Sequence, residues 1–265
     1  MNQSTPPTTT DRPHPDSHTA RSPGVESLVV CEDLSRHYGV GPARAAAVDE
    51  VSCTVSAGLR VALTGRSGSG KSTLLHLMAG LETATTGQVR WPGLGGAPAG
   101  RPDLVGVVFQ GLSLLPDLDV AENVGLPLLF ADPALTPGDR SPADRRVDPV
   151  ADALDRVGIG DLGDKLPEEL SGGQAQRVAV ARVLVARPRL ILADEPTVQL
   201  DHDTGRLVVS VLLDAAAELD AALIVATHDP RVAERLTEQW HMHDGRLVPT
   251  PPAPIGAGTA SGAPR

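Results

Sequence analysis

Residues 65–72 have the sequence Gly65-Arg66-Ser67-Gly68-Ser69-Gly70-Lys71-Ser72, which matches the phosphate-loop pattern G-x-x-x-x-G-K-[ST] in full. The apolar run 60–64 before it predicts a short buried strand, and residues 72–81 after it carry leucine and methionine at helical spacing. A strand, a glycine-rich loop and a helix in this order are the context that the pattern requires. The stretch therefore predicts a site for the phosphates of a nucleoside triphosphate.

The residue types of this loop suit phosphate binding. Its glycines let the backbone turn tightly, so that N–H groups and the start of the following helix face phosphate oxygens. Lys71 supplies a charge for the outer phosphates, and the Ser72 hydroxyl can ligate Mg²⁺. The simpler alternative is a glycine-rich turn that ends in an exposed lysine. The chain has only two lysines, Lys71 and Lys165, and one of them occupies the position that the pattern requires.

Length and composition limit the remaining possibilities. A chain of 265 residues can bury a large core, and with 2% aromatic residues that core must be mainly aliphatic. The net charge of −10 argues against a nucleic-acid partner, which needs clustered Lys and Arg. Cys31 and Cys53 fit neither metal nor redox spacings, so we expect small buried hydrophobic residues in a reducing compartment.

The ends of the chain differ in composition from its middle. Residues 1–26 are rich in Pro, Thr, Ser and His, and residues 249–265 in Pro, Gly and Ala, so we expect two disordered tails around an ordered domain at 27–248. No segment approaches 18 uninterrupted apolar residues, and the N-terminus lacks the apolar stretch of a signal peptide. A cytoplasmic location is therefore expected.

The stretch before the phosphate loop predicts a small antiparallel sheet. Ser27 to Asp33 and Val48 to Val55 have the pattern of two strands, joined by a loop that contains Tyr38, the only tyrosine. This side chain is suited to stacking on a flat base, although ordinary packing is the commoner role of a loop tyrosine.

After the loop's helix, two more strands and a helical block are expected. Gly87 to Trp91 and Leu104 to Phe109 have strand patterns, and Gln110 after the second points to the ligand crevice of an open α/β sheet. Residues 111–170 change to helical patterns with proline-rich joints, which indicates an inserted helical subdomain. One helix there begins with Asp148 and Pro149 and ends at Gly158.

Leu170-Ser171-Gly172-Gly173-Gln174 precedes a largely apolar helix. Ser171 with Gln174 satisfies the S-x-x-Q capping box, so one interpretation is a well-capped helix start. The other is a second anion site made of N–H groups and the Ser171 hydroxyl. Spacing alone does not decide between them.

The apolar strand Leu190 to Ala193 ends in two carboxylates, Asp194 and Glu195. Adjacent buried acids are costly without a cation, so Asp194 is expected to hold Mg²⁺ and Glu195 to polarise an attacking water. A turn through Asp201 then leads to a helix whose predicted buried face is Leu207, Val211, Leu212, Ala215 and Leu219.

A further buried strand, Ala221 to Ala226, ends in Thr227-His228-Asp229. A lone histidine is usually structural, but this one closes a strand beside the two acids, which favours contact with the γ-phosphate. His241 and His243 have no further metal ligands near them in sequence and are interpreted as strand residues facing one side.

Together these motifs resemble the nucleotide-binding domain of ATP-binding cassette (ABC) transporters, from about Leu28 to Val248. The resemblance implies an α/β fold: a P-loop NTPase (RecA-like) core with a small antiparallel β subdomain and an inserted α-helical subdomain at about 111–170. It implies an ATPase with ATP and Mg²⁺ as cofactors. Phosphate binding is assigned to Gly65 through Ser72 and Thr73, and metal binding to Ser72, Gln110 and Asp194.

The resemblance also assigns roles to single residues. Glu195 is expected to be the catalytic carboxylate, His228 the switch histidine and Gln110 the residue that links the helical subdomain to the metal. Tyr38 is expected to stack on adenine. Residues that would contact ATP across a head-to-tail homodimer are Ser171, Gly172, Gly173, Gln174 and Asp201.

Three stretches are similar to one subgroup, the lipoprotein-release and macrolide-export ATPases: 74–82, 106–110 and 121–128. This similarity implies an integral membrane permease as partner, a position at the inner face of the plasma membrane, and work in export or in lipid and lipoprotein extraction. The alternative is a regulator of a cell-wall or cell-division complex that moves no substrate. Val198-Gln199, Ala175 and Arg60 depart from the subgroup's usual residues, and we expect altered dimer coupling at most.

Overall fold

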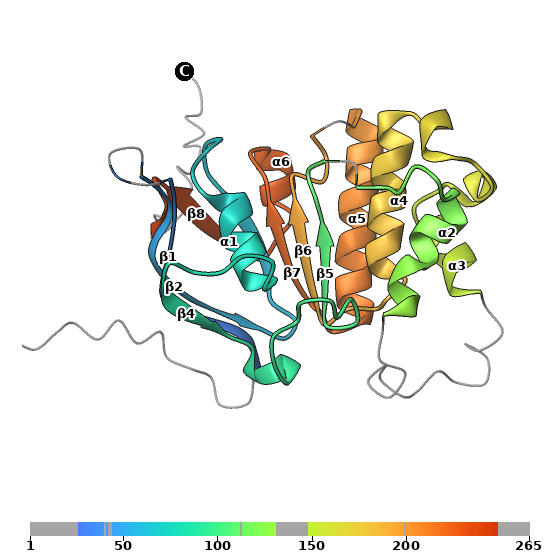
Figure 1. Ribbon diagram of the computed structural model, residues 1–265. Helices are drawn as coiled ribbons and strands as arrows, with labels where there is room; N and C mark the ends of the chain where they lie inside the picture. The colour runs from blue at the N-terminus through green and yellow to red at the C-terminus, as the bar shows by residue number, and fades with distance from the viewer. Residues whose placement is uncertain are drawn as a thin grey trace, which may run out of the picture.

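The computed structural model describes residues 26–39, 41, 44–111, 113–130, 148–198 and 200–248. The described residues form two sheets that stand side by side with helix α1 (Lys71–Met78) between them, and further helices cover the far face of the larger sheet (Figure 1). The expected tails lie outside the described residues apart from Glu26, as do residues 131–147 of the helical block and Gln199. The predicted α/β class is confirmed.

The smaller sheet has the strand order β2-β1-β4 and is antiparallel. Its strands are β1 (Ser27–Tyr38), β2 (Ala45–Ser56) and β4 (Thr86–Arg90). The predicted antiparallel sheet is therefore present, but the expected loop position of Tyr38 is wrong. Pairing between β1 and β2 continues as far as Tyr38 opposite Ala45, so the tyrosine is the last residue of a strand.

The larger sheet has the order β5-β6-β7-β3-β8-β9, and β9 alone runs antiparallel to its neighbour among the described strands. Its strands are β3 (Arg60–Thr64), β5 (Val105–Val108), β6 (Leu190–Asp194), β7 (Ala222–Ala226), β8 (Glu238–His243) and β9 (Arg246–Val248). Because β3, β6 and β7 are parallel neighbours, the phosphate loop, the two acids and His228 all follow strands at the same edge.

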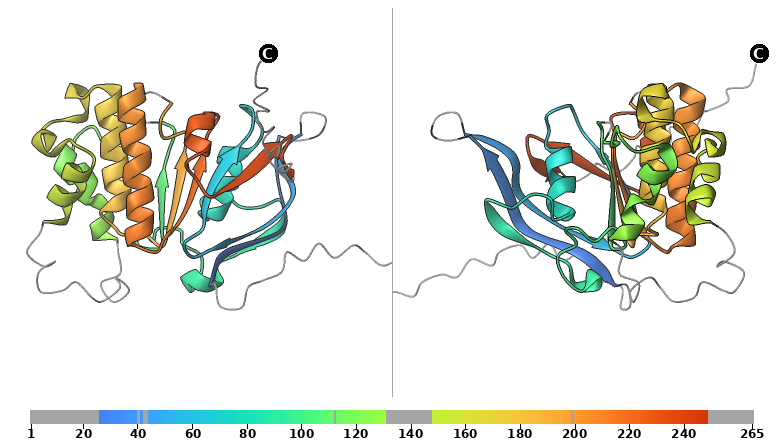
Figure 2. Two further views of the ribbon diagram at one scale, coloured as in Figure 1. Left: turned by 180° about the vertical axis from the view of Figure 1, so that it is seen from behind. Right: turned by 45° about the vertical axis from the view of Figure 1, so that its right-hand side comes forward.

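Side chains alternate across this sheet and build two cores. On β6, Leu190 and Leu192 pack on the side of α1 and the smaller sheet, whereas Ile191 and Ala193 pack on the opposite side. That opposite side is covered by α4 (Gly172–Leu184) and α5 (His202–Glu218), as both views of Figure 2 show. All five residues of β6 are buried, as expected for a strand covered on both faces.

Two expectations about helices are wrong in detail. Helix α1 ends at Met78 instead of residue 81, because Gly80 takes a left-handed conformation with φ of 68°, and Leu81 is 51% exposed. In α5, Leu207 and Leu219 do not belong to the core: Leu207 is 39% exposed, while Val208 and Val209 are buried. The remaining predicted residues of that face, Val211, Leu212 and Ala215, are buried.

The helical block lies beyond α4, at the far end from the smaller sheet (Figure 1). It contains α2 (Val120–Gly125), α3 (Pro149–Arg156) and short 3-10 helices at Leu126–Leu129, Gly160–Leu162 and Pro167–Glu169. The predicted start of α3 is present, since the Asp148 carboxylate accepts a hydrogen bond from Val150 N at 3.0 Å. Outside this block lie a 3-10 helix, Pro92–Leu94, and the short helix α6 (Pro230–Ala233).

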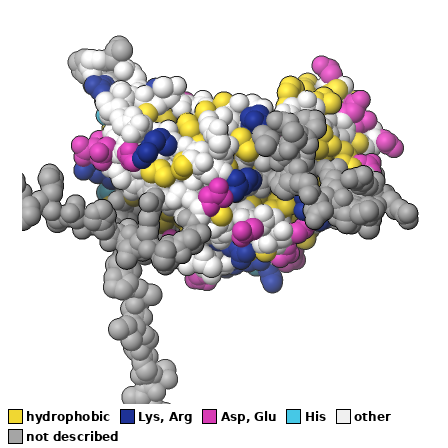
Figure 3. Space-filling model, turned by 90° about the horizontal axis from the view of Figure 1, so that it is seen from below, with side chains coloured by type: hydrophobic (Ala, Val, Ile, Leu, Met, Phe, Trp, Pro, Cys, Tyr) yellow, Lys and Arg dark blue, Asp and Glu magenta, His cyan; other side chains and the backbone are white. Residues whose placement is uncertain are grey.

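Basic and acidic side chains are interspersed on the described surface of the face that Figure 3 displays. Among the surface ion pairs is a group around Glu218, which accepts from Arg156 at 2.7 Å and from Arg187 at 3.1 Å. This group joins α3 of the helical block to the end of α5 in the core. Hydrogen bonds from the two guanidiniums lower the pKa of the Glu218 carboxyl, and the bond from Arg156 has the largest effect.

Asn123 on α2 is fully buried and holds the preceding loop in place. Its amide nitrogen donates to the carbonyls of Leu115, Leu118 and Asp119 at 2.9–3.0 Å, and its oxygen accepts from Leu115 N at 2.8 Å. We predict that Asn123→Ala lowers the free energy of unfolding by about 2–4 kcal/mol, because it leaves buried backbone groups unpaired. Urea unfolding measures this effect.

The matched control is Glu122→Ala on the same helix. Glu122 accepts from Asp119 N at 3.0 Å in an exposed capping box, so its loss is expected to cost about 1 kcal/mol or less. Equal losses for the two variants would contradict the assigned role of Asn123.

Candidate functional site

The phosphate loop is shaped by three glycines with positive φ: 141° at Gly65, 78° at Gly68 and 100° at Gly70. A Cβ atom at Gly65 would lie 2.3 Å from the carbonyl oxygen of Met242, and one at Gly70 would lie 1.9 Å from that of Ala47. No side chain fits at either position. The glycine spacing of the motif is therefore required both by the backbone angles and by close contact with β8 and β2.

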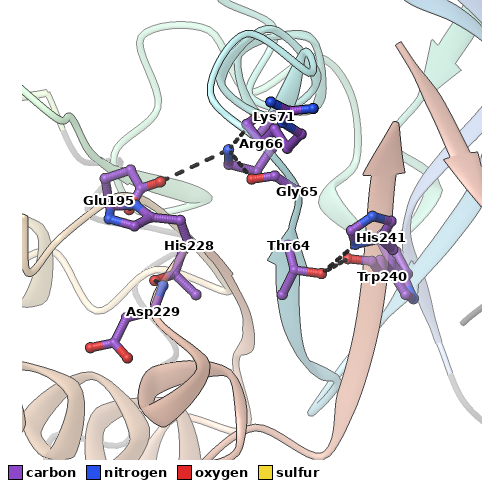
Figure 4. Close-up of polar contacts among 10 residues, drawn as sticks. Thr64, Gly65, Arg66, Lys71, Glu195, His228, Asp229, Trp240 and His241 are labelled. Carbon is purple, nitrogen blue, oxygen red and sulfur yellow. Dashed lines mark hydrogen bonds and ion pairs between the residues drawn. The ribbon is translucent and has the colours of Figure 1, made fainter. Parts of the chain in front are cut away.

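The loop leads directly into α1, whose first residue is Lys71. This side chain is 7% exposed, and its ammonium donates to the carbonyls of Gly65 at 2.9 Å and Arg66 at 3.2 Å. Figure 4 shows the ammonium directed toward Glu195, whose Oε1 atom is 3.9 Å away. The loop thus folds back around its own lysine, and the cation faces the acids at the end of β6.

Those acids are both buried, with 4% exposure for Asp194 and 8% for Glu195. Glu195 has a φ of 47°, a left-handed conformation that is rare and strained for a residue with a side chain. Its N–H donates to Ala226 O at 2.9 Å, and its Oε2 atom is 2.9 Å from His228 Nδ1. The strained turn thereby places the carboxylate between Lys71, at the start of α1, and His228, which follows β7 (Figure 4).

Burial raises the pKa of the Asp194 carboxyl, and a hydrogen bond with the Ser72 side chain acts in the opposite direction. Asp194 Oδ1 is buried and has no hydrogen-bond partner among the described residues. An unpaired carboxylate oxygen beside a serine hydroxyl fits a hard divalent cation such as Mg²⁺. The described residues contain no group of three or more His, Cys, Asp or Glu side chains that could hold a metal, so such a cation would also need oxygen ligands from a nucleotide or water.

The residue before the loop, Thr64, anchors β3 to β8. Its hydroxyl donates to Trp240 O at 3.2 Å and is 3.1 Å from His241 Nδ1 (Figure 4). His241 and His243 lie in β8 as expected, and His243 is 3.3 Å from Asp244. These histidines therefore take part in strand and surface contacts.

Ser171 forms the predicted capping box with Gln174. Ser171 N donates to Gln174 Oε1 at 2.8 Å, and Gln174 N donates to Ser171 Oγ at 3.2 Å. Ser171 and Gly172 are exposed, and the structure gives no hydrogen bond between residues 171–174 and the cluster around Lys71 within the described ranges. Asp201 is likewise exposed and caps α5, accepting from Asp203 N and Thr204 N at 3.1 and 3.0 Å.

Tyr38 lies on the smaller sheet, apart from these groups. It is 40% exposed, its hydroxyl donates to Glu82 Oε1 at 3.2 Å, and the Arg36 guanidinium carbon lies 4.7 Å from the ring centroid. Arg36 also pairs with Glu82 at 2.8 Å. The ring therefore carries a cation on one face and remains partly accessible to solvent.

Gln110 follows β5 and is exposed. Three residues later, the carbonyl and hydroxyl oxygens of Ser113 accept hydrogen bonds from Arg182 on α4, the carbonyl at 2.7 Å. Burial lowers the pKa of Arg182. The sequence gives little sign of this tie between the segment after Gln110 and α4, because α4 contains two arginines, Arg177 and Arg182, and Ser113 lies far from them along the chain.

Residues 48–198 match the family model of the ABC transporter ATP-binding domain. The chain belongs to the ABC transporter family. An uncharacterised ABC transporter ATP-binding protein of Mycobacterium tuberculosis is 39% identical over 232 residues, which cover 84% of this chain and 90% of the relative. The lipoprotein-releasing system ATP-binding protein LolD of Bordetella pertussis is 39% identical over 225 residues, covering 82% and 94%.

Solved structures agree. An ATP-binding cassette dimer in a post-hydrolysis state, bound to ADP and Pi, matches with a TM-score of 0.74 and 33% identity over 83% of this chain and 96% of that one. The chain is thus the ATP-binding and ATP-hydrolysing subunit of an ABC transporter, and the predicted family, fold and ATPase activity are confirmed. None of the helices in the described ranges is long and apolar enough to cross a membrane.

The burial of Asp194 predicts a trade-off between stability and function. We expect Asp194→Asn to raise the melting temperature of the nucleotide-free chain at pH 7 by about 2–4 °C, because an amide in this position carries no buried charge. The same variant should lose Mg²⁺-dependent ATP hydrolysis. Thermal unfolding with and without Mg²⁺ and ATP measures both effects.

Glu195→Gln is the matched comparison, because the Glu195 carboxylate already has His228 and Lys71 as partners. Its replacement should therefore give a smaller gain in melting temperature or a loss. A lower melting temperature for Asp194→Asn than for the wild type would show that its charge is compensated in the folded chain.

Proposed function

We propose that this chain works as a homodimer that binds two ATP molecules between its subunits and energises a separate membrane permease, in export or in lipid or lipoprotein extraction. The observation that carries the proposal is the meeting of Lys71, Asp194, Glu195 and His228 at one sheet edge, while Ser171 lies exposed elsewhere on the chain. Support for the transport class comes from the 39% identity to LolD over nearly the whole domain.

Lys71 and the loop glycines would bind the phosphates. In the nucleotide-free chain, the Lys71 ammonium is held by two carbonyls of its own loop and by the distant Glu195 carboxylate. Phosphate oxygens carry more charge than carbonyls, so ATP is expected to replace these internal partners. The N–H groups from Gly65 through Ser72 and Thr73, together with the start of α1, would hold the phosphates in one orientation.

Ser72 and Asp194 would hold Mg²⁺, with Gln110 reaching the same site from the end of β5. The unpaired Oδ1 atom of Asp194 and its neighbouring serine hydroxyl support this assignment. Bound Mg²⁺ would neutralise phosphate charge and orient the terminal phosphate. By holding this ion, the side-chain oxygens of Ser72 and Asp194 would fix the position of the triphosphate relative to Glu195.

Glu195 would accept a proton from the attacking water, and His228 would position it. His228 Nδ1 lies 2.9 Å from Glu195 Oε2, so the imidazole already constrains the carboxylate. When Lys71 turns toward phosphate, one oxygen of the Glu195 carboxylate loses its ion-pair partner and is free to accept a hydrogen bond from the attacking water. His228 is mostly exposed and could also reach the γ-phosphate once ATP is present.

The remaining phosphate contacts would come from a second copy of the chain. Ser171, Gly172, Gly173 and Gln174 form an exposed, capped helix start, and Asp201 marks a second exposed helix start. In a head-to-tail dimer these groups would close over the ATP bound to the facing subunit. Similar solved cassettes are dimers, which supports this arrangement.

Tyr38 would stack on adenine with the ring face that Arg36 leaves open. A partly exposed aromatic ring at a strand end can accept a flat base at little cost. The chain would then lie at the cytoplasmic surface of a membrane through its permease.

We predict that Glu195→Gln keeps ATP binding and lowers turnover about 100-fold or more, because it removes a positioned proton acceptor. Measuring phosphate release together with binding of a fluorescent ATP analogue separates the two effects. His228→Ala should lower turnover less than Glu195→Gln does. Unchanged turnover in Glu195→Gln would remove Glu195 from the role of base.

The same variant tests the wider function. Glu195→Gln with ATP should remain in the dimeric state, so a tagged chain should recover its membrane partner most efficiently under these conditions. Recovery of a permease supports transport. Its recovery together with cell-wall hydrolases would favour the regulatory alternative, and the absence of any membrane protein would contradict the proposal.

Ser171 allows a separate test of the dimer. We predict that Ser171→Arg abolishes hydrolysis and leaves ATP binding to the monomer intact, because a long cation at the exposed helix start blocks the facing subunit. Light scattering in ATP should show monomers. Glu168→Arg, a nearby exposed change outside the capping box, is the control and should retain activity. Normal hydrolysis by Ser171→Arg would exclude the head-to-tail site.

A further inference from the structure

The chain has two cysteines, and the fold places them directly opposite each other. Cys31 on β1 pairs with Cys53 on β2 in the antiparallel register, and on its other side Cys31 pairs with Val89 of β4. Residues directly opposite in an antiparallel pair project to the same face of the sheet. Both thiols are free. The sequence spacing gave no sign of this pairing, because it depends on the hairpin register.

This position meets the main requirement of a disulfide. Opposed residues in antiparallel strands have Cα atoms about 4.5 or 5.5 Å apart, and disulfides span Cα separations of about 4.4–6.8 Å. Their Cβ atoms are typically about 4.5–5.5 Å apart and must approach to about 3.5–4.5 Å. The register between β1 and β2 becomes irregular between Cys31 and Leu34, so the regular ladder ends beside the pair.

The two thiols differ in access. Cys31 is 2% exposed and belongs to the core between the sheets, whereas Cys53 is partly exposed and packs against that core. A hydrogen bond with the Cys31 thiol raises the pKa of Cys53, and burial raises it further. The Cys53 thiol therefore loses its proton less readily than a free cysteine does, which makes its reaction with an oxidant slow. Cys53 is the more accessible of the two thiols to a small oxidant. If its sulfur is oxidised, the Cys31 sulfur is in contact with it and can react next.

We propose that Cys31 and Cys53 form an oxidation site at which a hydroperoxide produces a reversible cross-strand disulfide. With hydrogen peroxide as oxidant, Cys53 gives up its thiol proton and its sulfur attacks one peroxide oxygen; the O–O bond breaks, and the departing hydroxide takes up that proton, so that a sulfenic acid and one water are formed. The Cys31 sulfur then attacks the Cys53 sulfur and expels the hydroxyl group, which leaves with the Cys31 thiol proton as a second water. Two thiols lose two electrons in total, and one peroxide molecule is reduced to two waters.

The bond would join the central strand of the smaller sheet to one of its edge strands. It would close the segment between residues 31 and 53, which contains the end of β1 with Tyr38 and the start of β2. Closing a segment of this size restricts the unfolded chain. The oxidised protein is therefore expected to be more stable than the reduced one.

The test uses the full-length wild-type chain, freed of reductant and treated with hydrogen peroxide at pH 8. Intact mass should fall by about 2 Da with loss of both titratable thiols. Cleavage after arginine should release peptide 22–36 joined to peptide 45–60. The melting temperature should rise by about 5 °C or more and return to its original value after dithiothreitol.

Cys31→Ser and Cys53→Ser are the matched controls and should show neither the joined peptides nor the rise in melting temperature. A control without any substitution uses the unfolded wild-type chain. Its thiols are alkylated before peroxide is added, which identifies Cys31 and Cys53 as the two thiols. The proposal is overturned if the wild type keeps two free thiols under peroxide or cross-links only between chains. Over-oxidation of Cys53 to a sulfinic acid, with Cys31 still free, would also overturn it.

Discussion

The structure depends on placing one buried cation against two buried carboxylates at a single edge of a parallel sheet. Lys71, Asp194 and Glu195 are each less than 10% exposed, and none of them would be stable alone in this environment. Lys71 is balanced by loop carbonyls and by Glu195, whereas Asp194 remains under-compensated, with one oxygen unpaired among the described residues. The neighbouring strands β3, β6 and β7 hold these groups together because parallel strands end at the same edge. Charge balance at this edge is thus incomplete on the side of the carboxylates, which favours a ligand that brings a divalent cation.

The backbone near this edge is strained in ways that serve the same purpose. Glu195 has positive φ although it is not glycine, and its N–H is fixed by Ala226 of the adjacent strand. Gly65 and Gly70 approach carbonyls of β8 and β2 so closely that no side chain fits. The left-handed conformation of Glu195 costs stability locally and is maintained by β6 and β7, whose residues are all buried. The packing of these buried strands therefore offsets the local strain and keeps the Glu195 carboxylate in position.

Features of the fold and of the site that depend on residues close together in the chain were predictable from the sequence. The phosphate loop, the capping box of Ser171 and Gln174, and the start of α3 depend on residues within a few positions of one another, and their signals appeared as expected. Most of the errors arose where distant residues decide, although the early end of α1 depends on the nearby Gly80. The buried face of α5 shifted to Val208 and Val209 because that helix packs against both α4 and β7. Tyr38 belongs to β1 because pairing with β2 extends the strand. Asn123 and Arg182 were missed, since their partners are backbone groups that only the folded chain brings near.

The proposed division of the ATP site between two chains accounts for the positions of Ser171 and Asp201. Ser171 and Asp201 each satisfy their own helix starts, yet both stay exposed and apart from the Lys71 cluster. A capped helix start keeps further N–H groups and the positive end of the helix available for an anion, so the cap does not exclude a second role. If all phosphate contacts lay in one chain, ATP would bind without bringing subunits together. In the proposed dimer, the phosphate contacts are divided between α1 of one chain and the start of α4 of the other. Nucleotide occupancy and subunit contact would then be a single equilibrium, in which a bound triphosphate stabilises the contact and its hydrolysis weakens it.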